Sequence, residues 1–147
     1  MKRFFRLLSK IELIFFFLIG ALIGVITLLL AFTPIPQNKE WVVPSEAIKK
    51  SNPVASNPQS IADGKIIYIK NCYDCHGMKG KGDGPKGGDF EISPGNFTKE
   101  DFQKQKDGAV FWKISEGRKP MPSFKKDLTE IQRWTVINYV RTLGIKK

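Results

Sequence analysis

The sequence predicts an all-α fold with long irregular loops, preceded by one transmembrane helix at the N-terminus. Two observations lead to this fold class. Apolar residues recur at helical spacing towards the C-terminus, whereas no useful length of sequence alternates between apolar and polar residues as a strand does. Residues 13–32 are twenty consecutive residues without a charge, and as a helix they would be about 30 Å long, the thickness of a bilayer core.

The basic N-terminal flank, residues 1–12, sets the expected orientation of that helix. Its Lys and Arg residues predict a cytoplasmic N-terminus and place the rest of the chain on the periplasmic (outer) face of a bacterial cytoplasmic membrane. A cleaved signal peptide is the alternative, but the apolar run is longer than the roughly 7–15 residues of a signal core, and no small-x-small cleavage site follows it. The four basic residues are Lys2, Arg3, Arg6 and Lys10.

Charge and composition divide the remainder of the chain. Residues 33–59 hold five of the nine prolines and show no sustained apolar period, so we expect a linker there. Residues 60–147 form the predicted globular domain, a length at which apolar burial alone gives a marginal core. The exported part holds 20 Lys and Arg against 13 Asp and Glu, a formal charge of +7, which favours acidic partner surfaces or anionic lipid. Nucleic acid is not an expected partner, because the exported domain has no recognition-helix or zinc-finger pattern.

The first helix of the domain is expected at 60–71, where Ser60 and Asp63 have the spacing of a capping box. Gly64 is unfavourable there by roughly 1 kcal/mol relative to alanine, so it needs a reason such as the close approach of another helix. A glycine-rich loop follows over 77–95. We then expect a helical turn at 98–102 and a second helix at 107–117, which stops at its glycine.

The C-terminal helix is the clearest predicted element. Asp127 is the expected N-cap, with Glu130 at the third helical position, and Gly144 marks the end. Its apolar residues recur at helical spacing and are Leu128, Ile131, Trp134, Ile137, Val140 and Leu143.

The candidate functional site is the stretch NCYDCHG at residues 71–77, which holds both cysteines and the only histidine. A disulfide between Cys72 and Cys75 would close a very short loop and would leave His76 unexplained. A thioredoxin-like redox pair needs a βαβ setting, which the sequence lacks. A closed zinc site needs four ligands, and a three-ligand catalytic zinc site would have to draw all of them from five consecutive residues.

Covalent haem uses every residue of this motif. Two thiols three residues apart can bond to the two vinyl groups on one edge of a porphyrin, and the histidine after the second cysteine is then placed as an axial ligand of the iron. We therefore expect one haem c attached at Cys72 and Cys75 and ligated by His76.

Residues 60–147 resemble a class I monohaem cytochrome c, with CYDCH after a helix, a glycine-rich loop containing Pro85, a middle helix, a Met-Pro pair and a final helix ending WTVINYVRTLG. The resemblance implies a small cytochrome c fold of three to four helices around the haem, in which Gly64 faces Tyr139 where the first and last helices cross. It also implies that the Pro85 carbonyl accepts a hydrogen bond from the free ring nitrogen of His76, with a neighbouring loop carbonyl as the alternative.

The second axial ligand is predicted by elimination, because no second histidine exists. Met1 lies on the far side of the predicted membrane. Met78 is two residues after His76, on a segment already tied to the proximal face of the haem. Met121 is far enough along the chain to reach the distal face, and its flanking prolines hold it in an extended loop. Met121 is therefore the expected ligand.

An iron with histidine and methionine on its two faces has no open site for oxygen or peroxide, which favours electron transfer over catalysis. The sequence thus predicts a membrane-anchored carrier of single electrons, not an enzyme, in a respiratory or photosynthetic chain. The carrier would be either a free tethered protein or a fixed subunit of a membrane complex. A haem-based small-ligand sensor or weak peroxidase is the alternative. Redox partners with acidic docking surfaces would meet a ring of lysines, Lys79, Lys81, Lys119, Lys125 and Lys126.

Overall fold

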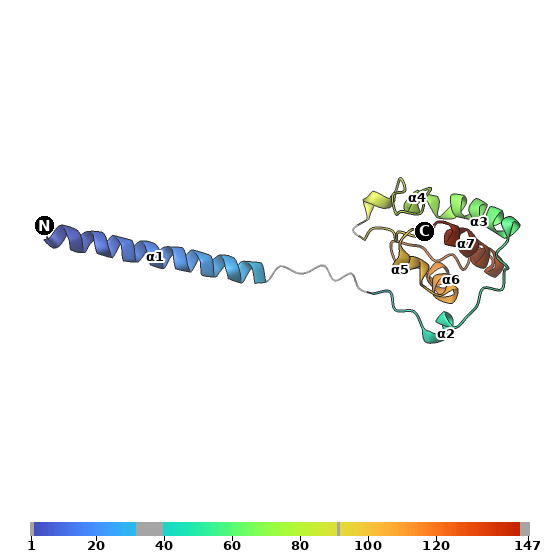
Figure 1. The fold of residues 1–147 in the computed structure, drawn as a ribbon, viewed down its shortest axis with the longest axis horizontal. Helices are drawn as coiled ribbons and strands as arrows, with labels where there is room; N and C mark the ends of the chain where they lie inside the picture. Colours follow the sequence, from blue (N-terminus) through green and yellow to red (C-terminus); the bar gives the residue numbers. More distant parts are fainter. Residues whose placement is uncertain (1, 32–39, 91, 145–147) are drawn as a thin grey trace. The chain divides into compact units, whose positions relative to one another are not determined.

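The computed structural model describes residues 2–31, 40–90 and 92–144, and within the first of these ranges it describes the side chains of Glu12 and of residues 14–28. The chain divides into two compact units, Met1–Lys39 and Glu40–Lys147. Figure 1 shows one long helix in the first unit and a cluster of shorter helices in the second. Each unit is described by itself below.

The first unit consists of helix α1 (Lys2–Ala31). Apolar side chains along it are exposed, among them those of Phe15, Phe16 and Phe17. In the part of the chain that the structure describes, no helix has the length and apolar character needed to cross a membrane. The predicted transmembrane segment 13–32 is helical as far as Ala31 but is not confirmed as a span. The side chains of Leu13 and of residues 29–32 lie outside the described residues.

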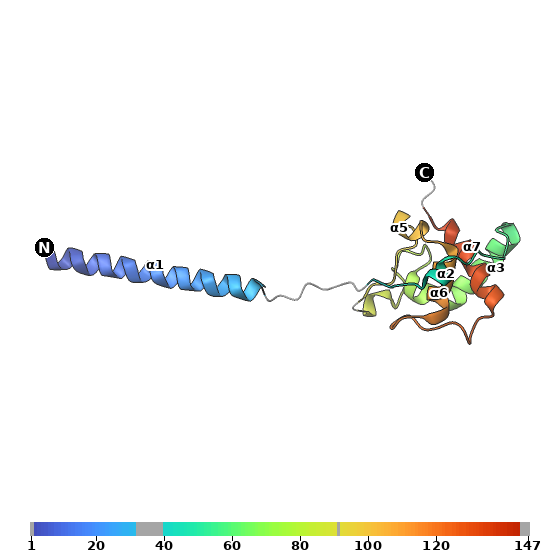
Figure 2. The same ribbon diagram turned by 90° about the horizontal axis from the view of Figure 1, so that it is seen from below.

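The second unit is built on the crossing of α3 (Pro58–Asn71) with α7 (Glu130–Thr142), seen in Figures 1 and 2. Gly64 lies at this crossing. A Cβ atom on Gly64 would come within 2.5 Å of the Thr135 carbonyl oxygen and 3.0 Å of the Tyr139 Cβ. The predicted contact between Gly64 and Tyr139 is therefore confirmed, and it explains why a poor helix former stands in the first turns of α3.

Both of these helices begin at caps other than the predicted ones. The N-cap of α3 is Asn57, whose side chain accepts from the Ser60 amide, while the Ser60 hydroxyl accepts from the Asn57 amide. The expected N-cap Ser60 is thus the third helical residue. In α7, Thr129 and Gln132 form the capping box in place of Asp127 and Glu130. In each helix the N-cap is the residue whose side chain accepts from the amide of the third helical residue, Ser60 in α3 and Gln132 in α7.

Helix α6 (Asp107–Glu116) packs on α7, with the ring of Phe111 stacked on Trp134 at 4.0 Å between centroids. The predicted middle helix is therefore confirmed within one residue of its expected end. The predicted turn at 98–102 is also present as α5, which begins two residues later than expected, at Glu100. The described residues contain helices and one isolated β-bridge, between Arg118 and Met121, so this part of the chain is all-helical. The shorter elements are α2 (Ser45–Ile48), α4 (Tyr73–His76), η1 (Gly87–Asp89) and α5 (Glu100–Gln103).

Residues 40–57, which we call the strap, pack on the helices of the second unit. The Asn138 side chain in α7 donates to the Val54 carbonyl oxygen at 3.1 Å and accepts from the Asn52 side chain at 2.9 Å. At Gly108 in α6, a Cβ atom would collide with carbonyl oxygens of the strap. The domain boundary expected at residue 60 is therefore too far along the chain. The expected linker 33–59 is wrong from residue 40 onward, and residues 33–39 lie outside the described residues.

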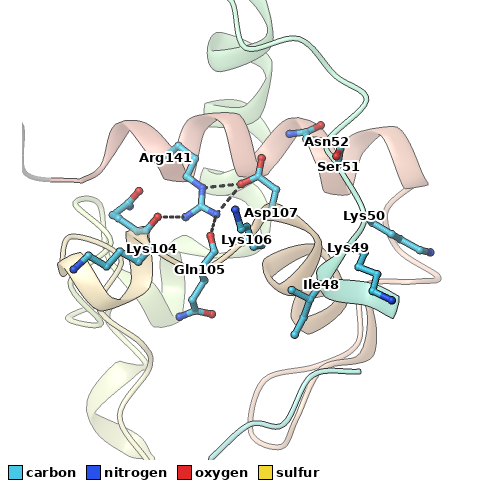
Figure 3. A pocket seen from close by; sticks show the side chains of 11 residues that line it. Ile48, Lys49, Lys50, Ser51, Asn52, Lys104, Gln105, Lys106, Asp107 and Arg141 are labelled. Carbon is cyan, nitrogen blue, oxygen red and sulfur yellow. Dashed lines mark hydrogen bonds and ion pairs between the residues drawn. The ribbon is translucent and has the colours of Figure 1, made fainter. Parts of the chain in front are cut away.

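Arg141 joins the end of α7 to the start of α6, as Figure 3 shows. Its Nε and Nη2 atoms lie 2.9 and 2.7 Å from the Asp107 carboxylate. Its other N–H groups donate to the carbonyl oxygens of Phe102, Gln103 and Gln105. The pocket beside this pair is lined by the strap and by the segment from Gln103 to Asp107, and it includes none of the predicted site residues.

Candidate functional site

The two cysteines and the histidine lie on one tight turn at the end of α3. Cys72 is the C-cap of α3 and the N-cap of α4; its amide donates to the Tyr68 carbonyl at 2.8 Å, and its carbonyl accepts from the His76 amide at 2.9 Å. Both cysteines are free thiols and partly exposed. The close spacing of Cys72, Cys75 and His76 in the sequence therefore places all three on a single helical turn.

The glycine-rich loop holds the backbone of this turn. The amides of Gly82, Gly84 and Lys86 donate to the carbonyl oxygens of His76, Cys75 and Asp74, respectively, at 2.9, 3.3 and 2.7 Å. A Cβ atom on Gly84 would lie 2.5 Å from the Asp74 carbonyl oxygen, so the loop approaches the turn as closely as a glycine allows. The carbonyl ends of α4 are thereby satisfied by protein rather than by water.

The imidazole of His76 is fixed by two contacts, one with the last residue of this loop and one just beyond it. Its ring is stacked on that of Phe97, with 4.3 Å between centroids and 25° between the planes. Its Nδ1 atom lies 3.3 Å from the Gly95 carbonyl oxygen. Burial lowers the pKa of His76, an effect that the Gly95 carbonyl opposes. In the neutral tautomer that donates from Nδ1 to Gly95, the lone pair of Nε2 is left for a metal.

The expectation that Pro85 supplies this carbonyl is wrong, and Gly95 takes its place. Pro85 is exposed and stands between Gly84 and Lys86, whose amides face the backbone of the turn. The loop around Pro85 is thus engaged with the main chain of residues 74–76 and not with the imidazole. Sequence spacing could not distinguish the two carbonyls, because each belongs to a proline-containing part of the same loop, Pro85 near its middle and Pro94-Gly95 at its end.

Buried aromatic residues support the turn from the side of α3 and α7. The Tyr68 hydroxyl donates to the Gly77 carbonyl oxygen at 2.7 Å, and its side chain is fully buried. Burial raises the pKa of Tyr68, so the phenol keeps the proton that it donates. The ring of Tyr68 contacts those of Phe97 and Tyr139, at 6.4 and 5.1 Å between centroids. The sequence gives no signal for the contact of Tyr68 with Gly77, because Tyr68 carries no motif beyond its place in the predicted helix 60–71.

The alternatives to haem find no support in the arrangement of these groups. Among the described residues, no cluster of three or more His, Cys, Asp or Glu side chains could hold a metal ion. Burial, and then the neighbouring Cys75, raise the pKa of Cys72 to about 12.

Met121 lies on a separate turn, which begins where α6 ends. The Arg118 and Met121 backbones exchange hydrogen bonds of 3.0 and 2.9 Å, and the peptide bond between Lys119 and Pro120 is cis. Gly117 makes the turn with a φ of +67°, and a Cβ there would collide with Pro122. The Met121 side chain is half-buried. Its ligation of iron stays a prediction.

These residues fit a haem c. The turn offers two free thiols that could form thioether bonds with a porphyrin. It also offers an imidazole whose Nδ1 faces a protein carbonyl, which leaves Nε2 for the iron. A methionine sulfur on a second anchored turn completes the donor set that a low-spin c-type haem uses. The CYDCH turn thus supplies two thiols for attachment and an imidazole for the iron.

Comparisons with known proteins identify a family and several structural neighbours. The profile of the family "Cytochrome C oxidase, cbb3-type, subunit III" matches residues 59–140, more than half of the chain and all of the predicted site residues. No curated protein matches. A chain of the Kuenenia stuttgartiensis reducing HAO-like protein complex Kustc0457/Kustc0458 has a similar structure, with a TM-score of 0.58 and 34% sequence identity. The match covers 63% of this chain and 47% of that one, so it spans about half of the neighbour's length.

Proposed function

Because the chain belongs to the family described as cytochrome C oxidase, cbb3-type, subunit III, we propose that it is a monohaem electron-transfer protein. In this proposal Cys72 and Cys75 hold one haem c, and His76 and Met121 ligate its iron. The observation that carries the proposal is the orientation of the His76 ring. Its Nδ1 faces the Gly95 carbonyl, within a turn that also holds two free thiols.

The haem, when bound, supplies a one-electron couple between ferrous and ferric iron. The residues of the chain determine what that couple can do. The Gly95 carbonyl orients the His76 ring and increases its basicity, as outer partners of metal-ligating histidines do. Phe97 stacks on the same ring and limits the access of water to it. Met121 would supply the second protein ligand of the iron, and that ligand set would favour electron transfer over the binding of a substrate.

The methionine assignment is tested by replacing the two candidate sulfurs in turn. We expect the full-length wild-type protein to carry one haem per chain and to bind no carbon monoxide when reduced. The substitution Met121→Leu should lower the midpoint potential and allow carbon monoxide to bind, because one axial position opens. Met78→Leu is the matched control, since Met78 is 52% exposed and is not expected to ligate.

Two results would contradict the proposal. If Met78→Leu, rather than Met121→Leu, opened the iron, the distal ligand would be misassigned. If the wild-type protein bound carbon monoxide as readily as Met121→Leu, a small-ligand sensor or weak peroxidase would be the better description.

We also propose that α1 anchors the chain in a bacterial cytoplasmic membrane, with the haem domain on the outer face and in contact with a multi-protein redox assembly. The uncharged run 13–32 and its basic flank support the anchor. The structural neighbour is itself part of a protein complex, which supports the assembly.

Membrane anchoring is tested by changing two glycines of α1 at which an added side chain would meet nothing within 4 Å, Gly20 and Gly24. Replacing both by arginine should move the protein from carbonate-washed membranes to the soluble fraction, because each arginine costs about 2.5–3.5 kcal/mol at the centre of a span. Replacing both by leucine is the control and should leave the protein in the membrane fraction. Release of the wild-type chain by carbonate would contradict the anchor.

A further inference from the structure

Trp41, near the start of the strap, is the meeting point of two cations. The guanidinium carbon of Arg118 lies 4.7 Å from the centroid of the Trp41 ring, and the Lys113 ammonium lies 5.7 Å from it. Both distances are within the ~6 Å at which an aromatic face attracts a cation. The ring is also held edge-on by Trp112 of α6, at 6.4 Å between centroids.

The two cations that share this ring repel one another. Burial lowers the pKa of Lys113, and the neighbouring Arg118 lowers it further. Lys113 is additionally held by the Gln105 side chain, 2.7 Å from its Nζ atom.

Arg118 is also one arm of the turn that bears Met121. The Arg118 amide donates to the Met121 carbonyl and the Met121 amide to the Arg118 carbonyl, so the two backbones face each other directly. Beyond Met121 the chain is tied to the end of α6, where the Phe124 amide donates to the Ile114 carbonyl at 3.1 Å. Trp41 thus contacts the arm that precedes the methionine, and α6 holds the arm that follows it.

We propose that Trp41 is a positioning residue for Met121. By holding the Arg118 side chain, it keeps the 117–122 turn in the conformation that presents the methionine sulfur. The inference rests on the proposed function, since it requires Met121 to ligate the iron.

The experiment uses the full-length, haem-loaded protein and imidazole as a probe of the open distal position. Trp41→Ala should increase the apparent affinity of the oxidised protein for imidazole by roughly two- to fivefold, the factor expected for the loss of one cation–π contact. The weak long-wavelength absorption band of a methionine-ligated ferric haem should lose intensity in parallel. Trp41→Phe, which keeps an aromatic face, should restore most of both signals.

A double-mutant cycle with Arg118→Gln separates positioning from general loss of stability. If Trp41 acts through Arg118, then Trp41→Ala should have little further effect on imidazole affinity in the Arg118→Gln background. Val42→Ala is the matched control, because Val42 is the exposed neighbour of Trp41.

Equal imidazole affinity in Trp41→Ala and wild type would overturn the inference, as would additive effects of the two substitutions. The failure of the proposed function looks different: a wild-type protein without the methionine band, and with the imidazole affinity of Met121→Leu, would show that Met121 is not the ligand.

Discussion

At Gly64, a single missing Cβ sets how closely α3 and α7 approach each other. The nearest group is the Thr135 carbonyl oxygen, which belongs to the backbone of α7 and cannot move aside as a flexible side chain does. The contact was predictable because a glycine in the first turns of an amphipathic helix is unfavourable unless another helix needs the space.

We predict that Gly64→Ala destabilises the protein by about 1–3 kcal/mol, the usual cost of overfilling a packed contact. The apparent midpoint of thermal unfolding should fall by several degrees for a domain of this size. Gly88→Ala is the control, since a Cβ there would meet nothing within 4 Å and its φ is not positive. Equal midpoints for the two variants would show that the helices can move apart at no cost.

The His76 contacts show where residue-level prediction stops. The covalent motif fixes Cys72, Cys75 and His76 by spacing alone, because each has a defined chemical role. The partner of the His76 ring is a backbone carbonyl, and every residue has one. The choice of Gly95 over Pro85 depends on which loop segment donates its amides to the turn, and that is a property of the folded loop.

On the scale of elements, the strap is the main feature that the sequence does not reveal. Like a linker, it shows no sustained apolar period, yet it is fixed by asparagine side chains. Asn138, a polar residue within the buried face of α7, donates to the Val54 carbonyl and the Ser60 hydroxyl and accepts from Asn52. Such side-chain to backbone bonds leave no periodic pattern in the sequence, whereas the helices α6 and α7 do.

We predict that Asn138→Leu lowers the free energy of unfolding by about 1–3 kcal/mol, because it removes the hydrogen bonds between Asn138 and the strap while keeping the side-chain volume. Proteolysis within residues 40–57 should become faster as the strap loosens. Denaturant unfolding and limited proteolysis measure the two effects. Asn71→Leu is the control, since the Asn71 side chain bonds within its own helix, to Ile67. Strap cleavage at the wild-type rate in Asn138→Leu would contradict the role assigned to Asn138.

For the whole molecule, the surplus of basic residues has a direct bearing on how the haem domain meets its partners. The five lysines expected in a docking ring, Lys79, Lys81, Lys119, Lys125 and Lys126, are all exposed. Lys125 is paired with Glu116 at 2.5 Å, so it would have to break an existing contact to reach a partner. Net charge could be read from the sequence, but this pairing required the folded turn after α6.

We predict that replacing Lys79 and Lys81 by glutamine flattens the ionic-strength dependence of electron exchange with an acidic redox protein. Exposed charges near the cysteine turn steer such a partner, and salt screens them over about 10 Å at 0.1 M. The matched control replaces Lys49 and Lys50, two strap lysines that line the pocket beside Arg141. This double substitution removes the same amount of charge from another part of the domain. Stopped-flow rates over a series of salt concentrations measure the slopes. If both pairs flatten the slope equally, the partner responds to net charge alone, and the lysines of the cysteine turn have no particular role in docking.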